Sequence, residues 1–394
     1  MKKELISIKI LSLLSEGGSR SMKPTNKLGE ILAANLYWDK RRIDCLVKIL
    51  IALMAVQTVN LTRIANYMGD IKSKIPARYR RLQRFFSYCK INYDVIAAFI
   101  IKLFGFDQKK FYLTMDRTNW KWGKKDINVL FLGIVYKGTA IPIYWLPLNH
   151  KGNSNTKQRI ALIKRFIKRF GSSNILGLLG DREFVGQDWF AWLDQQQVPF
   201  FFRVKQDAIS TNSRGLEVDI NGLFYGLRIG EKRVLQGKRK IYKNQLHISG
   251  TLGKSGELVI IVSNVYTDEA IETYCHRWEI ETLFQCLKNR GFRFEETHMT
   301  EMRKIKKLIV LLAIAFCWAH KVGEWRCANE KQIKLKKHGR KEKNIFRYGL
   351  DLLQDAVSKI ERKISLIMKL LKLLLPPIMD GLAIGQCQFS SGEF

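Results

Sequence analysis

The sequence predicts a mixed α/β fold, in which a sheet core is flanked by helical N- and C-terminal regions. Three observations along the 394 residues predict it. Before about residue 108, apolar residues recur at steps of three and four, which is typical of amphipathic helices. From there to about residue 300, short apolar runs bounded by Gly and Asn alternate with amphipathic segments. Helical periodicity returns from residue 301 to the C-terminal region.

The charge balance indicates a polyanionic partner. The chain carries 68 Lys and Arg against 35 Asp and Glu, a formal net charge of +33. Such a surplus opposes compaction unless a polyanion compensates it, so nucleic acid is the favoured partner. A basic ribosome-associated or membrane-surface protein is the alternative. The longest apolar run, 308–319, is too short to span a bilayer, and we expect no membrane span.

The cysteines and the N-terminus suggest a reducing compartment. The seven cysteines are an odd number and contain no CxxC pair. This argues against a disulfide framework and against a structural zinc site. The first 18 residues lack a small-residue cleavage site, so we expect no signal peptide. We therefore expect a cytoplasmic, nucleoid-associated protein.

Residues 28–108 are predicted to form a helical DNA-binding domain, after a tail at 1–27 that we expect to be disordered. Residues 62–68 and 76–89 are predicted to be two short helices joined by a turn, an arrangement that fits a helix-turn-helix DNA reader. An ordinary bundle with a solvated basic face is the alternative. The second helix has a basic side with these candidate DNA contacts: Arg78, Arg81 and Arg84, beside Arg80.

Residues 109–300 are predicted to form the catalytic domain. The expected elements are strands at 111–116, 128–136 and 140–148, a helix at 156–170, a strand at 174–181, a helix at 187–197 and a strand at 199–205. This order is that of the RNase H-like fold, a mixed sheet with helices on its faces. The strand-rich stretch from about 206 to 267 is then a β insertion before the next long helix.

Two aspartates follow strands of this predicted sheet. Asp116 ends the first strand and Asp181 ends the fourth. These strands are neighbours in an RNase H-like sheet, so we expect the two carboxylates to meet. Carboxylate pairs suit Mg²⁺, which prefers oxygen ligands. Either aspartate alone is an ordinary turn residue, but together their positions favour a metal site.

The segment 274–292 carries a polar stripe. Tyr274, Arg277, Glu281 and Lys288 fall within an arc of about 60° at roughly 100° per residue of helix. Glu281 is the candidate third metal ligand. The tyrosine, arginine and lysine are candidates for gripping phosphates beside the reacting bond. A solvated amphipathic helix is the alternative, although it explains neither the spacing nor the two aspartates.

Residues 301–394 are predicted to form a helical C-terminal region. A helix at 302–325 is followed by a basic linker at 331–343 and by an amphipathic helix at about 345–375, which stops at Pro376 and Pro377. The last helix is a candidate dimerisation element, because its leucines fall on one side: Leu366, Leu370, Leu373 and Leu374.

The spacing Y-x2-R-x3-E-x6-K resembles the YREK signature of bacterial insertion-sequence transposases of the insertion-sequence-four family. The segments DRTNWKWG at 116–123 and GDREF at 180–184 resemble that family's surroundings of its two aspartates. The segment 290–300 resembles the stretch after its glutamate helix. Four matched blocks in the right order cover roughly residues 35 to 320.

This resemblance implies a cut-and-paste DNA transposase with an RNase H-like core and a β insertion. It implies that Asp116, Asp181 and Glu281 form a DDE triad binding two divalent ions, Mg²⁺ or Mn²⁺. It also implies that Tyr274, Arg277 and Lys288 contact transposon-end DNA. The implied partners are double-stranded DNA, as terminal inverted repeats and as target, and a second copy of the chain in a synaptic complex.

In some relatives excision passes through a DNA hairpin, with a flipped base stacked on a tryptophan of the insertion. Residues 206–267 contain no tryptophan, so Trp120 and Trp122 are the candidate substitutes, and Trp120 is a candidate DNA contact. Two alternative functions remain: a stand-alone nuclease on the same fold, and a catalytically inactive DNA-binding protein.

Overall fold

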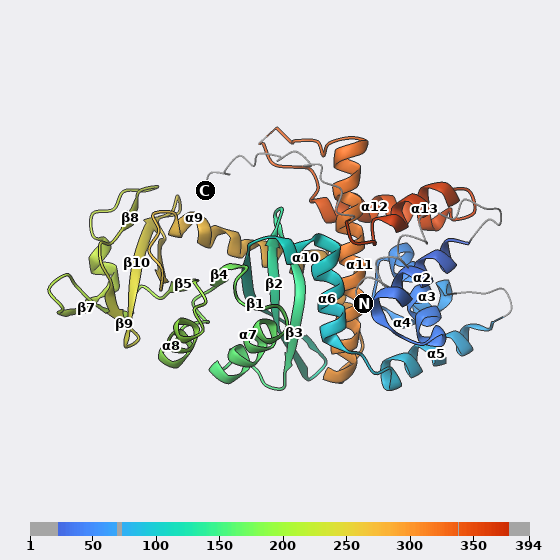
Figure 1. Cartoon of the computed structure of the whole chain (residues 1–394), viewed down its shortest axis with the longest axis horizontal. Helices are drawn as coiled ribbons and strands as arrows, with labels where there is room; N and C mark the ends of the chain where they lie inside the picture. The colour runs from blue at the N-terminus through green and yellow to red at the C-terminus, as the bar shows by residue number, and fades with distance from the viewer. Residues whose placement is uncertain (1–22, 69–72, 338, 378–394) are drawn as a thin grey trace, which may run out of the picture.

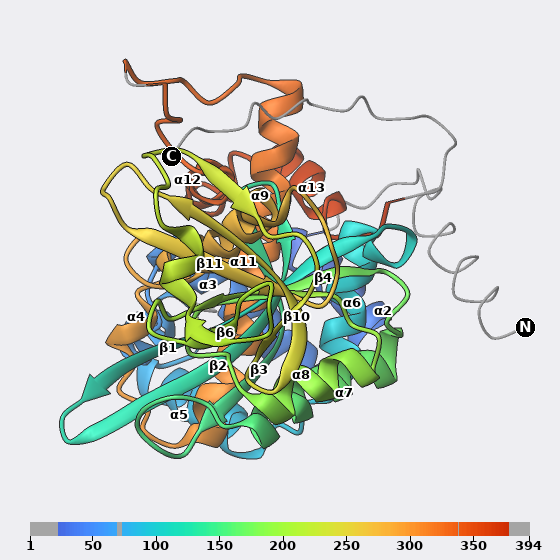
Figure 2. The ribbon, with the colours of Figure 1, turned by 90° about the vertical axis from the view of Figure 1, so that its left-hand side faces the viewer.

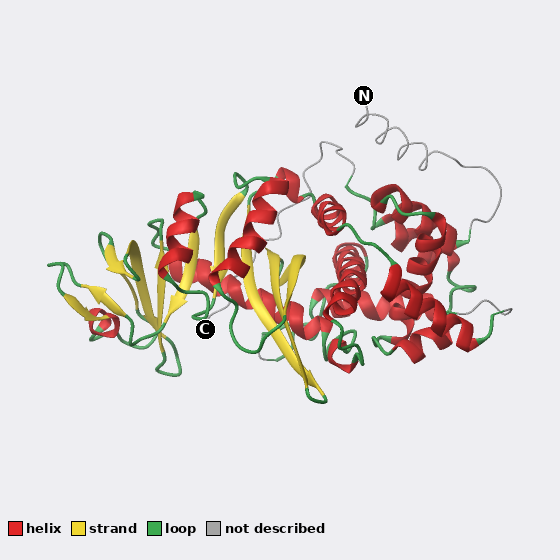
Figure 3. Cartoon of the chain, turned by 90° about the horizontal axis from the view of Figure 1, so that it is seen from below, coloured by secondary structure: helices red, strands yellow, loops and turns green. Residues whose placement is uncertain are grey.

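The computed structural model describes residues 23–68, 73–337 and 339–377. The molecule is elongated, with helices at one end and a long twisted sheet that continues to the other end (Figure 1). Figure 3 shows this division, because strands fill its centre and one side while the other side is helical. The tail expected at 1–27 lies almost wholly outside the described residues.

The centre of the sheet has the predicted topology. Its strands are β1 (Phe111–Trp122), β2 (Lys125–Tyr136), β3 (Thr139–Leu148), β4 (Ile175–Gly180) and β5 (Phe200–Val204). They lie in the order β3-β2-β1-β4-β5. The first three strands are antiparallel, and β4 and β5 run parallel to β1. The helices α7 (Thr156–Phe170) and α8 (Gln187–Gln195) connect the parallel strands. The predicted mixed RNase H-like sheet is therefore confirmed.

Strand β1 is twice as long as predicted, so the expectation that Asp116 ends it was wrong. The pairing of β1 with β4 ends at Met115 and Gly180. Beyond that point β1 pairs only with β2, as far as Trp122. The polar stretch stays extended because β2 supplies its backbone partners, and Gly123 closes the hairpin at a φ of 55°. The resulting hairpin projects from the body of the molecule (Figure 2).

The β insertion extends the central sheet. Its strands are β6 (Ile209–Thr211), β7 (Glu217–Asp219), β8 (Lys232–Val234), β9 (Arg239–Ile241), β10 (Asn244–Leu252) and β11 (Leu258–Ser263). Strand β11 pairs antiparallel with β5, and the other strands follow outward from it. The insertion thus forms the far end of one continuous sheet.

The N-terminal helices form a bundle around α3. They are α2 (Pro24–Leu36), α3 (Lys40–Val56), α4 (Leu61–Tyr67), α5 (Ile75–Tyr88) and α6 (Tyr93–Phe104). The bundle begins before the predicted boundary at 28, because Pro24 is well suited to the first turn of a helix. The two expected short helices are α4 and α5. No single described helix is long and apolar enough to cross a membrane; α3 and α4 pass that test only as a pair bent by 105°.

The C-terminal half contains α9 (Ala270–Cys275), α10 (Glu279–Leu287), α11 (Met302–Asn329), α12 (Ile345–Ser358) and α13 (Ile364–Lys372). The single helix expected at 345–375 is therefore two helices. Helix α11 stands between the sheet and the N-terminal bundle and contacts both (Figure 1). Helix α13 packs on α2 and α12.

The proposed dimerisation face of α13 is buried within the chain. Leu370 and Leu374 are fully buried, and Leu366 and Leu373 are partly buried against the same core. The carbonyl oxygen of Leu370 accepts a hydrogen bond of 3.0 Å from the indole of Trp318. The amphipathicity that suggested dimerisation is explained by packing inside one chain.

Candidate active site

The two predicted aspartates lie side by side on neighbouring strands. Asp116 and Asp181 come one residue after the last paired residues of β1 and β4, Met115 and Gly180. The Oδ1 atom of each aspartate accepts a 2.7 Å hydrogen bond from the backbone N–H of the next residue. Because the strands are parallel and in register, both carboxylates stand where β4 ends.

The segment α9–α10 brings the predicted polar stripe onto these aspartates. The hydroxyl of Tyr274 donates to Asp181 Oδ1 at 3.5 Å. Arg277 contacts Asp116 Oδ2 through Nη1 at 3.5 Å and Glu281 Oε1 through Nη2 at 2.8 Å. The guanidinium of Arg277 therefore bridges the first and third predicted carboxylates.

Lys288 does not join this arrangement. A 3-10 turn, His276–Trp278, separates α9 from α10, and α10 ends at Leu287. Lys288 has a non-helical backbone (φ −91°, ψ −114°), and its Nζ pairs with Glu295 Oε1 at 2.6 Å. The prediction of one four-residue stripe was wrong for Lys288, because it assumed a regular helix through residue 288.

An ion pair that we did not predict lies beside the aspartates. Arg117 binds both carboxylate oxygens of Glu183, with Nε at 2.8 Å and Nη2 at 2.7 Å. Arg117 also donates to Asn128 and Asn153 at 3.1 and 3.0 Å. The sequence contained the signal, since Arg117 follows Asp116 directly and Glu183 is in the GDREF segment.

A cavity of about 290 Å³ opens in front of the two aspartates. It is lined by Asp116, Asn153, Asp181, Arg182, Glu183 and Lys205. Lys205, which comes directly after β5, was also missed. Its signal is topological, because a residue that follows β5 lies at the same sheet edge as one that follows β4. The cavity thus combines carboxylates with cations at the end of parallel strands.

The environment of Asp116 favours its protonated form in the absence of a cation. Burial raises the pKa of Asp116 to about 7, and the nearby carboxylates of Glu183 and Asp181 add to the rise. The backbone N–H of Arg117 and the guanidinium of Arg277 act in the opposite direction but do not cancel it. The negative charge gathered here is therefore incompletely compensated by the protein's own cations.

The donor set fits a divalent cation in part. Among the described residues, no group of three or more His, Cys, Asp or Glu side chains is arranged to hold a metal ion. Asp116 and Asp181 nevertheless supply hard oxygen donors from adjacent positions, and Mg²⁺ commonly uses only one or two carboxylates. Asp116 and Asp181 can therefore hold a divalent ion, whereas the carboxylate of Glu281 is paired with Arg277.

The predicted basic side of α5 is divided in two. Arg78 donates to the Ser73 hydroxyl at 3.0 Å, and Arg81 pairs with Asp44 at 2.6 Å. Arg84 is exposed, as is Arg80 one turn before it. Arg78 and Arg81 therefore have partners within the bundle, whereas Arg80 and Arg84 present charge to solvent.

Trp120 is buried, so it is not available as a stacking surface in this conformation. Its ring is 8% exposed and packs on Phe294 with ring centroids 4.6 Å apart. Trp122, two residues along β1, is 39% exposed and stacks on His298 at 4.3 Å. Strand alternation does not cause the difference, because residues two apart share a face. The difference arises because the hairpin leaves the body of the molecule between the two residues (Figure 2).

A comparison with known protein families identifies the region that contains this site. Residues 98–318 match the family described as "Transposase DDE domain", a range that contains both aspartates and the glutamate. None of the curated proteins matches the sequence. A solved structure described as "Cryo-EM structure of piggyBac transposase synaptic complex with hairpin DNA" is 14% identical, with a TM-score of 0.45, over 92% of this chain and 87% of that chain. This similarity is too low to support an inference.

Proposed function

The chain belongs to the transposase DDE domain family and is a DNA-cleaving, strand-transferring enzyme; we propose that it is a cut-and-paste transposase of the insertion-sequence-four family, carrying the YREK signature. The residue spacing of that signature supports the finer assignment to a bacterial insertion sequence. In this proposal the helical region up to residue 108 binds DNA. Residues 109–300, which include the insertion, carry out catalysis. The helical region from residue 301 stabilises both of these parts.

One observation carries the proposal. Arg277 contacts Asp116 and Glu281, and Tyr274 contacts Asp181, so side chains from two strands and one later segment converge on one point. They are the three proposed DDE carboxylates and the first three residues of the proposed YREK signature. A solvated amphipathic helix would leave such side chains exposed, whereas Arg277 is 3% exposed.

We propose that Asp116, Asp181 and Glu281 are the catalytic carboxylates and hold divalent ions, which DDE transposases generally use. Mg²⁺ or Mn²⁺, two ions per site, would activate a water or a DNA 3′-hydroxyl and stabilise the leaving oxygen. Glu281 joins the aspartates by giving up its contact with Arg277. The guanidinium is then released to bind a phosphate of the DNA.

Other residues position the DNA in this proposal. Tyr274 and Arg277 contact the strand that is cut, and Lys205 lies in the cavity where its charge would meet the reacting phosphate. Lys288 reaches DNA only if it exchanges Glu295 for a phosphate. The partners are terminal inverted repeats and target DNA, bound by a homodimer in a synaptic complex. The setting is the cytoplasm, at the nucleoid.

The substitution Glu281→Gln tests the catalytic assignment. We expect cleavage of element-end DNA to fall at least about 10²-fold, since a carboxylate needed in the transition state is lost. Binding of the same DNA should stay within about threefold in a gel-shift assay. Glu272→Gln is the matched control, because Glu272 lies on α9 and pairs with Lys232, away from the aspartates. Retained cleavage by Glu281→Gln would show that the assignment is wrong.

The products distinguish the remaining alternatives. Purified protein is incubated with Mg²⁺, element-end DNA and a target plasmid. A transposase yields joined DNA, whereas a stand-alone nuclease yields cut ends alone. Binding without cutting in any divalent metal indicates an inactive DNA-binding protein.

A further inference from the structure

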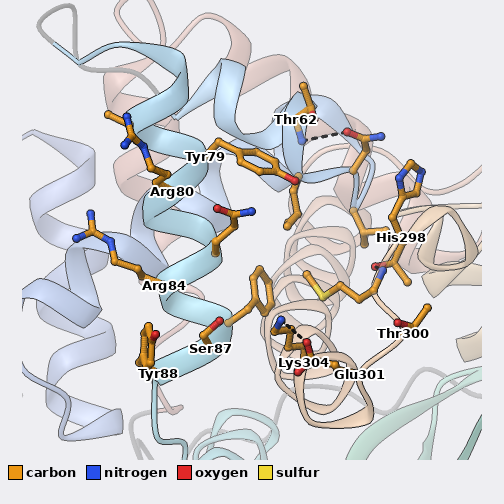
Figure 4. A pocket seen from close by; sticks show the side chains of 18 residues that line it. Thr62, Tyr79, Arg80, Arg84, Ser87, Tyr88, His298, Thr300, Glu301 and Lys304 are labelled. Atoms are coloured by element: carbon orange, nitrogen blue, oxygen red, sulfur yellow. Dashed lines mark hydrogen bonds and ion pairs between the residues drawn. The ribbon is translucent and has the colours of Figure 1, made fainter.

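A second cavity is a groove away from the carboxylates. Its volume is about 800 Å³, and it lies between α4 and α5 on one side and the segment 297–304 on the other. Figure 4 shows this groove, with His298, Thr300 and Lys304 across from α5. Arg80 and Arg84 extend side by side from the outer side of α5, at the rim away from these residues. None of Asp116, Asp181 and Glu281 lines it.

The lining of the groove is cationic and rich in hydrogen-bond donors. Its basic side chains are Arg80, Arg84, His298 and Lys304, and Glu301 is the one carboxylate among the described lining residues. The polar uncharged residues that line it are Asn60, Thr62, Gln83, Ser87, Thr297 and Thr300. Tyr88 lies at the edge and is 77% exposed. Such a surface suits a ligand with regularly spaced anionic oxygens.

The two walls of the groove are fixed to each other. Lys307 Nζ donates to the carbonyl oxygens of Phe86 and Ser87 at 2.7 and 3.2 Å, so α11 holds the C-terminal end of α5. The backbone N–H of Val59 donates to the carbonyl oxygen of Phe292 at 3.0 Å. The groove is therefore formed before any ligand binds. Little conformational entropy is lost on binding, because the walls are already ordered.

The groove also lies next to the β1–β2 hairpin. His298, on its far wall, stacks on Trp122 with ring centroids 4.3 Å apart. Trp122 is on the same strand as Asp116, about 20 Å away at the rise of about 3.3 Å per strand residue. A duplex rises about 3.4 Å per base pair, so that separation corresponds to roughly six base pairs.

We propose that this groove binds the sugar–phosphate backbone of duplex DNA several base pairs away from the bond that is cut. This inference rests on the proposed function, which identifies DNA as the ligand. Arg80 and Arg84 grip phosphates at one rim, and His298 and Lys304 meet the backbone from the other wall. The helical N-terminal region and the segment after the glutamate helix thus hold one duplex together.

The first test removes the two exposed arginines together. Binding of an element-end duplex is measured by fluorescence anisotropy in EDTA, over a series of salt concentrations. We expect Arg80→Ala/Arg84→Ala to weaken binding at least about tenfold at low salt. The slope of log K against log salt should fall by about 1.8, or about 0.9 for each phosphate that an arginine no longer neutralises.

The matched control removes two exposed cations with the same spacing on another helix. Lys164 and Lys168 are exposed on α7, which does not line the groove. Lys164→Ala/Lys168→Ala makes the same change in net charge, so we expect binding and salt slope close to those of the unaltered chain. Equal losses of affinity in the two double variants, or no loss in the arginine variant, would overturn the inference.

A gain of affinity provides a readout that misfolding cannot imitate. Glu301 pairs with Lys304 at 2.5 Å and neutralises part of the groove. We expect Glu301→Gln to tighten binding by about three- to tenfold at low salt, since a repelling carboxylate is removed and Lys304 is released. Unchanged or weaker binding by Glu301→Gln would count against the groove.

The outcomes separate this inference from the proposed function. Normal binding by the arginine variant, together with cleavage that depends on Glu281, rejects the groove and leaves the transposase assignment intact. Weakened binding by the arginine variant, in a chain that cuts no DNA with any divalent metal, supports the groove and rejects the catalytic proposal.

Discussion

Arg277 is the residue that organises the candidate site. Its guanidinium is almost fully buried, and it contacts carboxylates from β1 and from α10. A buried charge is tolerated only when it is paired, so the contact with Glu281 compensates Arg277 while no ligand is bound. The sequence could identify the residue type and spacing. It could not show that Arg277 bridges Asp116 and Glu281, because that depends on how α10 packs against the sheet.

Asp116 gives the metal-free protein a dependence of stability on pH. Its pKa is raised to about 7, so the folded state retains a proton that the unfolded state releases above about pH 4. Stability is therefore lost as pH rises from about 4 to about 7, and the loss is constant above that. We expect Asp116→Asn to be more stable than the unaltered chain at pH 8 and nearly equal to it at pH 4.

The measurement is denaturant unfolding in EDTA at both pH values. Each unit of pKa shift corresponds to about 1.4 kcal/mol, so the gain at pH 8 should amount to a few kcal/mol at most. Equal effects of the substitution at the two pH values would contradict the burial of this carboxylate.

The Arg117–Glu183 pair gives a second prediction at the level of single residues. Both side chains are 15% exposed, and removal of one partner leaves a charge beside Asp116. We expect Arg117→Ala to lower the free energy of unfolding by about 3 kcal/mol. The double variant Arg117→Ala/Glu183→Ala should lose less than the sum of the two single losses, by about 1–3 kcal/mol. Additive losses in denaturant unfolding would show that the pair does not interact.

The crossing of α11 and α12 shows how whole elements are fixed. Gly323 on α11 and Gly349 on α12 meet at the crossing, where a Cβ on Gly349 would overlap the carbonyl oxygen of Ala319. The backbones approach so closely because neither residue has a side chain. Since α11 also contacts β3 and α3, this crossing connects the C-terminal helices to both ends of the molecule.

Gly349→Ala should therefore separate two helices. We expect a loss of at least about 2 kcal/mol in the free energy of unfolding, because the added methyl meets backbone that cannot move aside. Gly29→Ala is the matched control, since a Cβ at Gly29 on α2 would lie 3.6 Å from Ile43, an ordinary contact. That substitution should stabilise the chain by about 0.5–1 kcal/mol. Similar effects of the two substitutions would refute the close crossing.

At the scale of the whole molecule, one sheet joins the two aspartates to the β insertion. The strand order runs from β3 through β5 and then through β11 to β7 without a break among the described strands. The helical bundle closes the opposite end and is held against the sheet by α11 (Figure 1). The C-terminal helix α13 completes this packing on the bundle, with its apolar face turned toward its own chain.

A substitution at Leu370 tests whether α13 stabilises a single chain or a dimer. The side chain is fully buried in the intramolecular core, so we expect Leu370→Ala to cost about 2–5 kcal/mol. In the absence of DNA, the denaturant midpoint of both proteins should not change over a hundredfold range of protein concentration. A midpoint that rises with concentration would indicate that α13 stabilises a dimer instead.

The sequence by itself determined the sheet topology, the two aspartates and the positions of Tyr274, Arg277 and Glu281, because hydrophobic periodicity and residue spacing are local properties of the chain. Tertiary structure alone decided that β1 continues past Asp116, that Lys288 leaves the helix, that Trp120 is buried and that Arg78 and Arg81 have partners within the bundle. Two of these outcomes depend on a partner distant in sequence: Phe294 for the tryptophan and Asp44 for Arg81. The other two depend on partners nearer in the chain, β2 for the strand and Glu295 for the lysine, whose pairing the periodicity does not specify. A local sequence pattern limits which structures and contacts a residue can form. Burial and pairing with other parts of the fold then determine which of these it forms.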